Sequence, residues 1–526
     1  EVHNVTEGSS DLTALPFLSF AIKDEIIIWS DVLPAWFPTT TLTANLHTNF
    51  KISAEGEKIY LSDADGISLD TLFVNVEFAD HSVGCVTDGA TATGIFMFAT
   101  PGASNTGATY DGYTTGEATF TLDAGFYTGT QITSINVPAG TEVHYTLNGE
   151  IPTLADPLYT SPITIDETQV IKARVFDLAG ELLPGQISTN TFFIDESISV
   201  PVISISTNND NLYGGFGIFD NWWNDWKKYA HVEYFDSLHY NAFEQAVGIK
   251  VDGGAGGSRS LEQKSMRVEL DNSAFGDGEL HYPLLKRRSW VEEYETFYLR
   301  NGSNMSNVLP YKDAFMVRTT EGTYNEHMAY EPVVIFINGE YWGLYELRNK
   351  LDEGHFENAK GVEGDSLDLL TLSYWYGLVL RTLSGSDTDF IAMRNYLGTY
   401  PTPEDPEFYF IADSLLDLKN FTDYIAAQMF FANYDWPYNN IKAWRDRGGD
   451  NKWKYALIDV ELGLGIGGWS DANADLIPGL FIPQEHIEPL YNLLKNPIYH
   501  DYFVNRYADL MNSTFLPERT LAMEDS

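Results

Sequence analysis

The chain has 526 residues, and its 31 Lys and Arg against 75 Asp and Glu give a formal net charge of −44. A surface of this sign repels phosphate backbones and anionic headgroups, which argues against DNA, RNA and membrane surfaces as partners. No run approaches the roughly 20 apolar residues of a membrane span. The single cysteine, Cys85, excludes an internal disulfide and a cysteine-cluster metal site. Because the length exceeds what one core serves, we predict two to four domains.

Residues 44–99 show short strands separated by turn signals. Lys58–Ser62, the turn Asp63-Ala-Asp-Gly66 and the apolar run after it predict a β-hairpin. Asp63, Asp65 and Asp70 suggest a calcium loop, but the turn explains them and the full EF-hand spacing is absent. The run LHTNFKISAEGEKIYLSDADG, followed by DHSVG and TPGASN, resembles the second half of a lamin-tail domain. That resemblance implies an Ig-like β-sandwich over residues 1–107, although the opening strands of the family are not evident before Leu12.

Residues 108–196 are again all β, with turns marked by Gly and Pro. VHYTLNGEIPT, YTSPITI and TQVIKARVFD resemble the small β-sandwich at the C-terminus of chitobiase and β-hexosaminidase enzymes. The resemblance implies a spacer or a weak glycan-binding module without catalytic residues. The segment FFIDESISVPVISIS (192–206) reads as a short linker into a larger domain.

From residue 199 onward the pattern becomes mixed α/β. EPVVIFINGEYWGLYELR predicts a hairpin around an Asn-Gly turn, and LKNFTDYIAAQMFFANY has the apolar spacing of a helix. KWKYALIDVELGLG predicts a strand that runs into glycines. EHIEPLYNLLKN and PIYHDYFVNRYADLMNSTF predict two amphipathic helices joined at Pro497. We therefore expect 199–526 to form one α/β (α+β) domain with its own core.

Two polar clusters in this region have the spacing of phosphoryl-transfer sites. Asp435 and Asn440 follow a predicted helix, where an Asp orients an attacking hydroxyl and an Asn reaches a nucleotide-bound metal. Asp459 and Glu461 follow a predicted strand, and in extended backbone they would face one Mg²⁺ together. Turn formation or helix capping also explains each cluster alone. Their combination favours a kinase-like site.

A third cluster is VDGGAGGSRSLEQKSMRVEL (251–270), in which glycines precede a strand that bears Lys264 and Arg267. Backbone N–H groups of such a loop, here at Gly257 and Ser258, approach phosphates, and a strand lysine clamps the α- and β-phosphates. The Walker sequence is absent, so the segment is not a P-loop. In isolation, a surface turn with a solvated lysine is the preferred explanation, and only the other two clusters favour a nucleotide site.

Six ordered blocks resemble the CotH (spore coat protein H) kinase family. They are GGAGGSRSLEQKSMRVEL, FYLRNGSN, YKDAF, INGEYWGLYELRNKLDEGHFENAKGV, ANYDWPYNNIKAWR and KWKYALIDVELGLG. The resemblance implies an atypical protein-kinase-like domain over 199–526 that uses ATP with Mg²⁺ or Mn²⁺.

Family roles transfer to matching positions only. Lys264 matches the nucleotide-phosphate lysine with Arg267 as its strand neighbour, and Asp435 matches the catalytic-loop aspartate. Asn440 and Asp459 match the metal-side residues. The matches of Arg300 and Asp313 carry no assigned role.

The sequence departs from the family pattern at three positions. Asn349 stands where the family has a glutamate, and Glu346, three residues earlier, is expected to face the other way. Glu461 keeps the charge of the family's second aspartate with a longer reach, and Ile458 replaces a tryptophan.

Other motifs point elsewhere only weakly. Gly463–Gly468 matches GxGxxG, but WSDANADLIPG after it is unsuited to the helix that a dinucleotide site needs. Trp222, Trp223 and Trp226 form a sugar platform or pack in the core or a lid. No HExxH, GxSxG or zinc-type histidine pattern occurs, and no acid pair for glycoside hydrolysis is singled out.

These patterns predict a secreted kinase at the bacterial cell surface or outside the cell. It would transfer the ATP γ-phosphate to hydroxyls of a protein substrate, with glycan contact through the β modules. The alternative is a non-catalytic surface or matrix protein, for adhesion or assembly, that carries a degenerate kinase-like domain.

Overall fold

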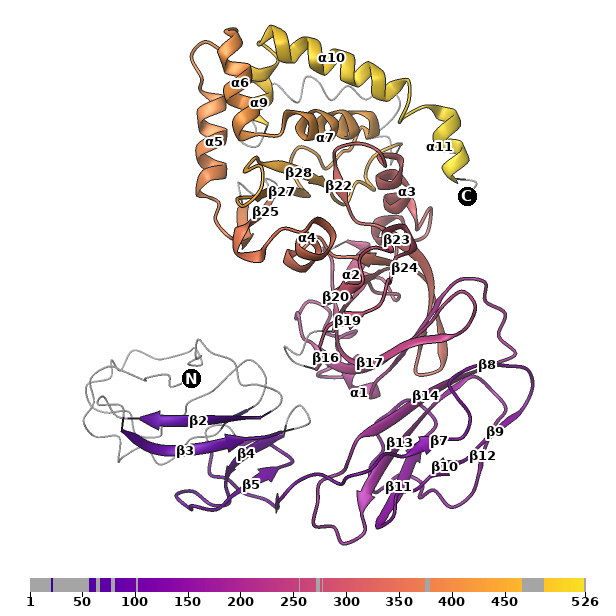
Figure 1. The fold of residues 1–526 in the computed structure, drawn as a ribbon. Coiled ribbons are helices and arrows are strands. Elements are labelled where there is room, and N and C mark those ends of the chain that lie inside the picture. Colours follow the sequence, from indigo (N-terminus) through magenta and orange to yellow (C-terminus); the bar gives the residue numbers. More distant parts are fainter. Residues whose placement is uncertain are drawn as a thin grey trace.

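The computed structural model describes residues 20–21, 56–62, 67–76, 81–100, 103–254, 256–270, 275–276, 278–373, 379–465 and 487–524. The N-terminal part is mostly β and the C-terminal part is mixed α/β (Figure 1). Within these residues, no helix combines the length and the apolar character needed to cross a bilayer.

The first β region contains a hairpin and a small antiparallel sheet. The predicted hairpin is confirmed, because β2 (Glu57–Ser62) pairs antiparallel with β3 (Ser68–Val74). Its turn, with Asp63 and Asp65, lies outside the described residues. The sheet has the order β1-β4-β5-β6 and consists of β1 (Phe20–Ala21), β4 (Ser82–Cys85), β5 (Thr93–Phe96) and β6 (Thr109–Tyr110).

The second β region is a module in which three sheets share one apolar core. Its main sheet has the order β11-β13-β14-β8, with β14 and β8 parallel. The strands of this sheet are β8 (Gly125–Tyr127), β11 (Thr141–Thr146), β13 (Gln169–Asp177) and β14 (Ile187–Ile194). The two small sheets pair β7 (Thr119–Phe120) with β10 (Ile135–Asn136), and β9 (Gln131–Thr133) with β12 (Ile163–Ile165). Ile135, Ile165 and Ile171 meet in the shared core.

The module packs directly on the next domain. Phe193 is fully buried, with its ring centroid 4.3 Å from that of Phe126 in the module, and 5.1 Å and 4.9 Å from those of Phe235 and Phe336 in the next domain. The buried Lys172 amine of the module donates to the Ser206 carbonyl oxygen at 3.2 Å.

The interpretation of 192–206 as a linker is therefore wrong for most of that segment. Residues 192–194 end β14, and 202–206 form a strand of the following barrel. Only 195–201 connect the two.

The C-terminal region begins with a closed barrel in the order β15-β16-β17-β18-β21-β24-β23. Its strands are β15 (Val202–Ser206), β16 (Lys228–Phe235), β17 (Asn241–Val251), β18 (Met266–Glu269), β21 (Thr296–Arg300), β23 (Tyr330–Ile337) and β24 (Glu340–Asn349). β23 and β24 confirm the predicted hairpin, and its turn residues Asn338 and Gly339 take φ values of 52° and 85°. An Asn-Gly pair tolerates this left-handed backbone. The barrel interior is a core of its own, which includes Val232, Ile249 and Phe297.

The second lobe is a five-stranded sheet with helices (Figure 1). Its strand order is β22 (Glu326–His327), β28 (Lys454–Leu457), β27 (Ile441–Asp446), β25 (Leu367–Ser373) and β26 (Val379–Ser384). The helices are α3 (Lys312–Thr319), α4 (Glu353–Lys360), α5 (Thr388–Gly398), α6 (Pro406–Leu415), α7 (Leu418–Phe431), α9 (Glu488–Leu493), α10 (Pro497–Met511) and α11 (Pro517–Glu524). The predictions of α7, α9 and α10 are confirmed.

The apolar clusters of the second lobe are separate from the barrel core, so 199–526 does not share the one core that we expected. The chain enters this lobe first with α3 and β22, between the barrel strands β21 and β23, and makes its last crossing from the barrel at 350–352, between β24 and α4.

Candidate functional site

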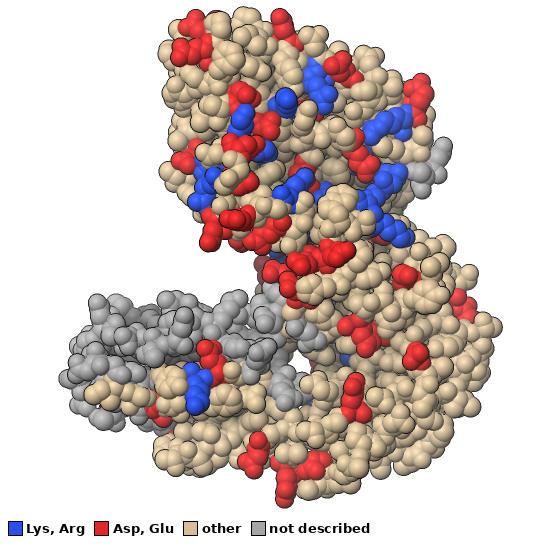
Figure 2. All heavy atoms as spheres, viewed as in Figure 1, with Lys and Arg blue, Asp and Glu red and all other residues tan. Residues whose placement is uncertain are grey.

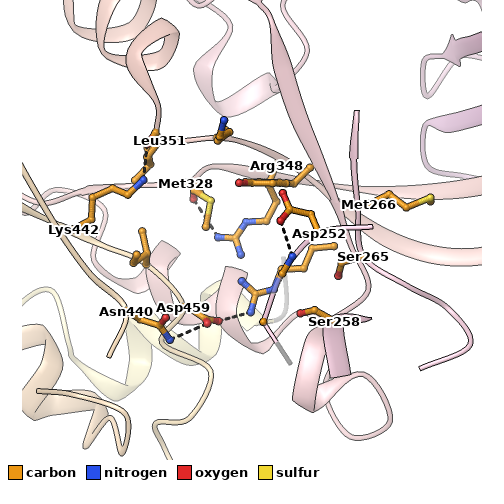
Figure 3. A pocket seen from close by; sticks show the side chains of 16 residues that line it. Asp252, Ser258, Ser265, Met266, Met328, Arg348, Leu351, Asn440, Lys442 and Asp459 are labelled. Carbon is orange, nitrogen blue, oxygen red and sulfur yellow. Dashed lines mark hydrogen bonds and ion pairs between the residues drawn. The ribbon is translucent and has the colours of Figure 1, made fainter. Parts of the chain in front are cut away.

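A cavity of about 230 Å³ lies between the two lobes, where the chain crosses from one to the other (Figure 3). Lys350 and Leu351 of the crossing segment line it. The barrel contributes Asp252, Gly253, Ser258, Ser265, Met266 and Arg300, and the second lobe contributes Asn440, Lys442, Ile458 and Asp459.

Asp435, Asn440 and Asp459 meet at one edge of this cleft. The Asn440 amide donates to Asp459 Oδ2 at 2.9 Å and to Asp435 Oδ2 at 3.2 Å. Asn440 follows the α7 turn and Asp459 follows β28, with φ values of 56° and 50°. Asn and Asp accept this left-handed backbone more readily than most residues. The two loops thereby bring three of the predicted site residues together.

The expected geometry of Asp459 and Glu461 is wrong, because β28 ends at Leu457 and the backbone at Asp459 is not extended. Their carboxylates nevertheless converge on one cation. Arg300 Nη2 lies 2.5 Å from Asp459 Oδ1 and 2.8 Å from Glu461 Oε2. Glu461 is buried, whereas the Asp459 side chain is 38% exposed at the cleft.

Asp313 on α3 also contacts Arg300, which pairs with Asp459 and Glu461. Its Oδ1 accepts the Val460 N–H at 2.6 Å, and its Oδ2 contacts both Arg348 and Arg300. Burial favours the neutral acid, but the two arginines hold the pKa of Asp313 down at about 2. Asp313 therefore fixes the backbone between the two site carboxylates. The sequence blocks contained Arg300 and Asp313 but gave no sign of this role.

Burial changes the pKa values of two acids around the cleft. It raises the pKa of Asp435, and it raises the pKa of Glu461 to about 7 although Arg300 opposes the change. A divalent cation beside such acids would favour their charged forms.

The oxygen donors present fit Mg²⁺ or Mn²⁺. Asp459 and Glu461 supply two carboxylates and Asn440 an amide oxygen, and Mg²⁺ is commonly held by one or two carboxylates plus substrate phosphates and water. The described residues include no cluster of three or more His, Cys, Asp or Glu arranged to hold an ion by themselves. A metal here would accordingly depend on phosphate oxygens for part of its coordination.

The glycine-rich segment is arranged differently from the prediction. The Lys264 amine donates to the carbonyl oxygens of Arg259 and Leu261 at 3.0 and 2.9 Å, and Ser265, not Lys264, lines the cleft. Lys264 thus fastens the short helix α2 (Gly257–Ser260).

The other residues predicted to contact the nucleotide, Gly257, Ser258 and Arg267, do not all lie at the cleft. The Gly257 N–H is taken by Asn304 Oδ1 at 3.1 Å, and Arg267 pairs with Glu269 at 2.9 Å. Of the four predicted residues, only Ser258 lines the cavity. The basic side chains that line it are Arg300, Arg348, Lys350 and Lys442.

Asn349 lies away from the cleft. It is buried, its Oδ1 accepts the Ala329 N–H at 2.8 Å, and its amide contacts His355. Glu346 lies on the opposite face of β24, 3.4 Å from Arg348.

The two remaining motifs are the tryptophan cluster and the GxGxxG run. Trp222 packs against the barrel core, while Trp223 is 59% exposed. The GxGxxG run extends beyond the described residues after Gly465.

A barrel lobe and a helical lobe that flank a cleft with Asp, Asn and Asp at its edge define a two-lobed, kinase-like protein. The model of the CotH kinase protein family matches residues 249–525, more than half of the chain, and the chain belongs to this family. The model of the chitobiase/beta-hexosaminidase C-terminal domain matches residues 122–185. The resemblances to the CotH family and to the chitobiase/beta-hexosaminidase module are thereby confirmed, and the resemblance of 1–107 to a lamin-tail domain stays a prediction. No curated protein matches the chain.

Proposed function

We propose that this protein is an ATP-dependent phosphotransferase that acts on hydroxyl groups of a protein. The observation that carries the proposal is the convergence of Asp435, Asn440 and Asp459 at the cleft between the lobes. Phosphoryl transfer needs position and positive charge more than covalent chemistry, and the cleft offers cations and metal-binding oxygens together.

Asp435 is the proposed proton acceptor. The acceptor hydroxyl oxygen forms a bond to the γ-phosphorus while the bond from that phosphorus to the β–γ bridging oxygen breaks, and the hydroxyl proton passes to Asp435. The raised pKa of Asp435 makes it a better base than an ordinary aspartate. Asn439 and Asn440 donate to its Oδ2 at 3.3 and 3.2 Å and fix its orientation.

Asp459, Asn440 and Glu461 are the proposed holders of Mg²⁺ or Mn²⁺. When bound, the ion would neutralise charge on the ATP phosphates. Arg300 and Arg348 lie beside these groups and line the cleft, so we assign them the phosphate contacts that the sequence suggested for Lys264. Ser258 reaches the cavity from the glycine-rich turn. Lys264 supports that turn through its carbonyl contacts.

The proposed setting is outside the cell or at the surface of a bacterium, with a surface protein as substrate. The net charge of −44 favours solubility and disfavours binding to nucleic acid. The module matched at 122–185 belongs to a family named for glycan-processing enzymes, which supports a glycan as a second partner.

A non-catalytic adhesion or assembly protein is the second candidate. Two observations favour it: Asn349 replaces the family glutamate, and Arg300 is paired with both proposed metal carboxylates. Such a protein would keep the two-lobed fold without metal-dependent nucleotide binding.

Calorimetric titration with a non-hydrolysable ATP analogue and Mg²⁺ separates the two. We expect binding that requires Mg²⁺ and is lost in Asp459→Asn, while the matched control Asp501→Asn, 82% exposed on α10, binds as the native chain does. Absence of binding by the native chain would reject the kinase and leave the second candidate.

A further inference from the structure

A second cavity, of about 340 Å³, is lined in part by Ala314, Val317 and Arg318 of α3, the helix that carries Asp313. Elements of both lobes form it, with η2 (Lys286–Arg288) and the following loop on one side and α3, β22 and α4 on the other. It shares Met328 with the nucleotide cleft and is otherwise lined by different residues. We call it the basic pocket.

The charge of the basic pocket is opposite to that of the chain. Of the described residues that line it, four are Arg or Lys and two are Glu, an excess of two formal positive charges in a chain of net charge −44. Figure 2 shows Lys and Arg spheres on the side of the molecule where α3 lies. The Debye length in physiological salt is about 8 Å, so a ligand inside the pocket experiences these nearby cations more than the distant acids.

Two of the cations at its rim are partly exposed to solvent. Arg287 is 42% exposed and its pair with Glu321 is long, at 3.5 Å. Lys360 is 38% exposed and shares Glu326 with Arg288 and His355. The Arg287–Glu321 pair is exposed and therefore worth little, so exchanging it for a bound anion costs little. Lys360 keeps its contact with the buried Glu326, and its ammonium group has further N–H donors for a ligand. Guanidinium groups bind phosphate through paired hydrogen bonds.

Trp290 gives the pocket an aromatic wall. Its side chain is 66% exposed although it stands among basic residues. An indole face left open at the edge of a cavity offers a flat ring a surface to stack on. A ligand group with two negative charges would balance the two excess positive charges of the pocket. A phosphomonoester carries about that charge at neutral pH.

We propose that the basic pocket binds a phosphomonoester attached to a flat ring, at a site separate from the nucleotide cleft. The phosphate lies among Arg287, Arg288 and Lys360, and the ring lies on Trp290. This inference does not depend on the proposed kinase activity.

Isothermal titration of the full chain with phenyl phosphate tests it, with phenol and inorganic phosphate as half-ligands. We expect binding in the sub-millimolar range that weakens with salt, with each half-ligand at least about tenfold weaker. Arg287→Gln and Trp290→Ala should each weaken it about five- to tenfold. Both side chains are exposed, so neither change threatens folding. The matched control is Lys286→Gln, which removes the same charge from the next residue, outside the pocket lining.

Asp459→Asn separates this site from the cleft, and phenyl phosphate should bind that variant unchanged. Three outcomes would overturn the proposal: no binding at about 10 mM phenyl phosphate, where a ligand of sub-millimolar affinity saturates its site, equal losses in Lys286→Gln and Arg287→Gln, or loss of binding in Asp459→Asn. ATP binding in the cleft is measured separately with the non-hydrolysable analogue, so failure of one proposal is distinguishable from failure of the other.

Discussion

Replacing Phe193 by Ala tests whether the β module is an integral part of the barrel domain. The side chain is fully buried, and its ring packs against Phe126 on the module side and against Phe235 and Phe336 on the barrel side. Truncating a buried phenylalanine costs about 3–5 kcal/mol. Since the lost contacts cross the boundary, most of that loss should fall on the coupling between the two units.

Urea unfolding followed in parallel by circular dichroism and tryptophan fluorescence measures this coupling. Residues 108–196 contain no Trp, so fluorescence follows the rest of the chain while circular dichroism also follows the module. We expect Phe193→Ala to unfold at lower urea than the native chain, and we expect its circular dichroism and fluorescence transitions to lie further apart. Ile132→Ala, at a 64% exposed position of the same module, should change stability by no more than about 0.5 kcal/mol. A loss below about 1 kcal/mol for Phe193→Ala, or an equal loss in the control, would refute the reasoning.

Three further predictions follow from the same contacts and from the cleft. A Cβ at Gly339 would lie 2.9 Å from the Gln169 backbone of the module, whereas Gly322 has a similar positive φ and open space; Gly339→Ala should therefore lose about 1–3 kcal/mol more than Gly322→Ala in thermal unfolding. A protease should nick the exposed residues 195–197, and the two pieces should still co-elute on size exclusion, whereas separation would contradict the buried interface. Burial raises the pKa of Glu346 to about 7 from 4.5, so the folded state keeps a proton that the unfolded state has lost. Stability should fall as pH rises from 4.5 to 7, by up to about 3 kcal/mol, and Glu346→Gln should flatten that fall in a pH series of unfolding measurements.

Asp435→Asn should leave analogue binding nearly intact and lower turnover by orders of magnitude, because Asp435 acts on the acceptor and not on the nucleotide. A radiolabel assay beside the calorimetry checks both quantities. If binding falls as far as turnover, Asp435 belongs to the nucleotide site and the assigned role is wrong.

Local sequence signals predicted the hairpins and helices well. The Asn338-Gly339 pair sets a turn by its own backbone preference, and the apolar spacing of Leu418–Phe431 sets a helix, so neither needs distant information. The number of Ig-like sandwiches and the domain boundaries stay predictions.

What failed depends on contacts between distant segments. Lys264 resembles a phosphate lysine by sequence, but its neighbour Ser265 bonds to the distant Asn301 and faces the cleft, while the Lys264 amine donates to Arg259 and Leu261. The backbone at Asp459 leaves the strand because Asp313, far away in the chain, binds the Val460 N–H. Phe193 gave no sign of an interface, since a buried residue facing its own core has the same sequence pattern as one facing a neighbouring domain.

The hairpin β23–β24 has a mechanical consequence. Its turn touches the module, since the Asn338 side chain lies against Gly149, and the other end of β24 runs into the crossing segment that lines the cleft. Ten residues of strand span roughly 33 Å. A pull on the N-terminal modules would therefore load the barrel through packed side chains and this stiff strand, and the tension would reach the cleft with no slack joint between them.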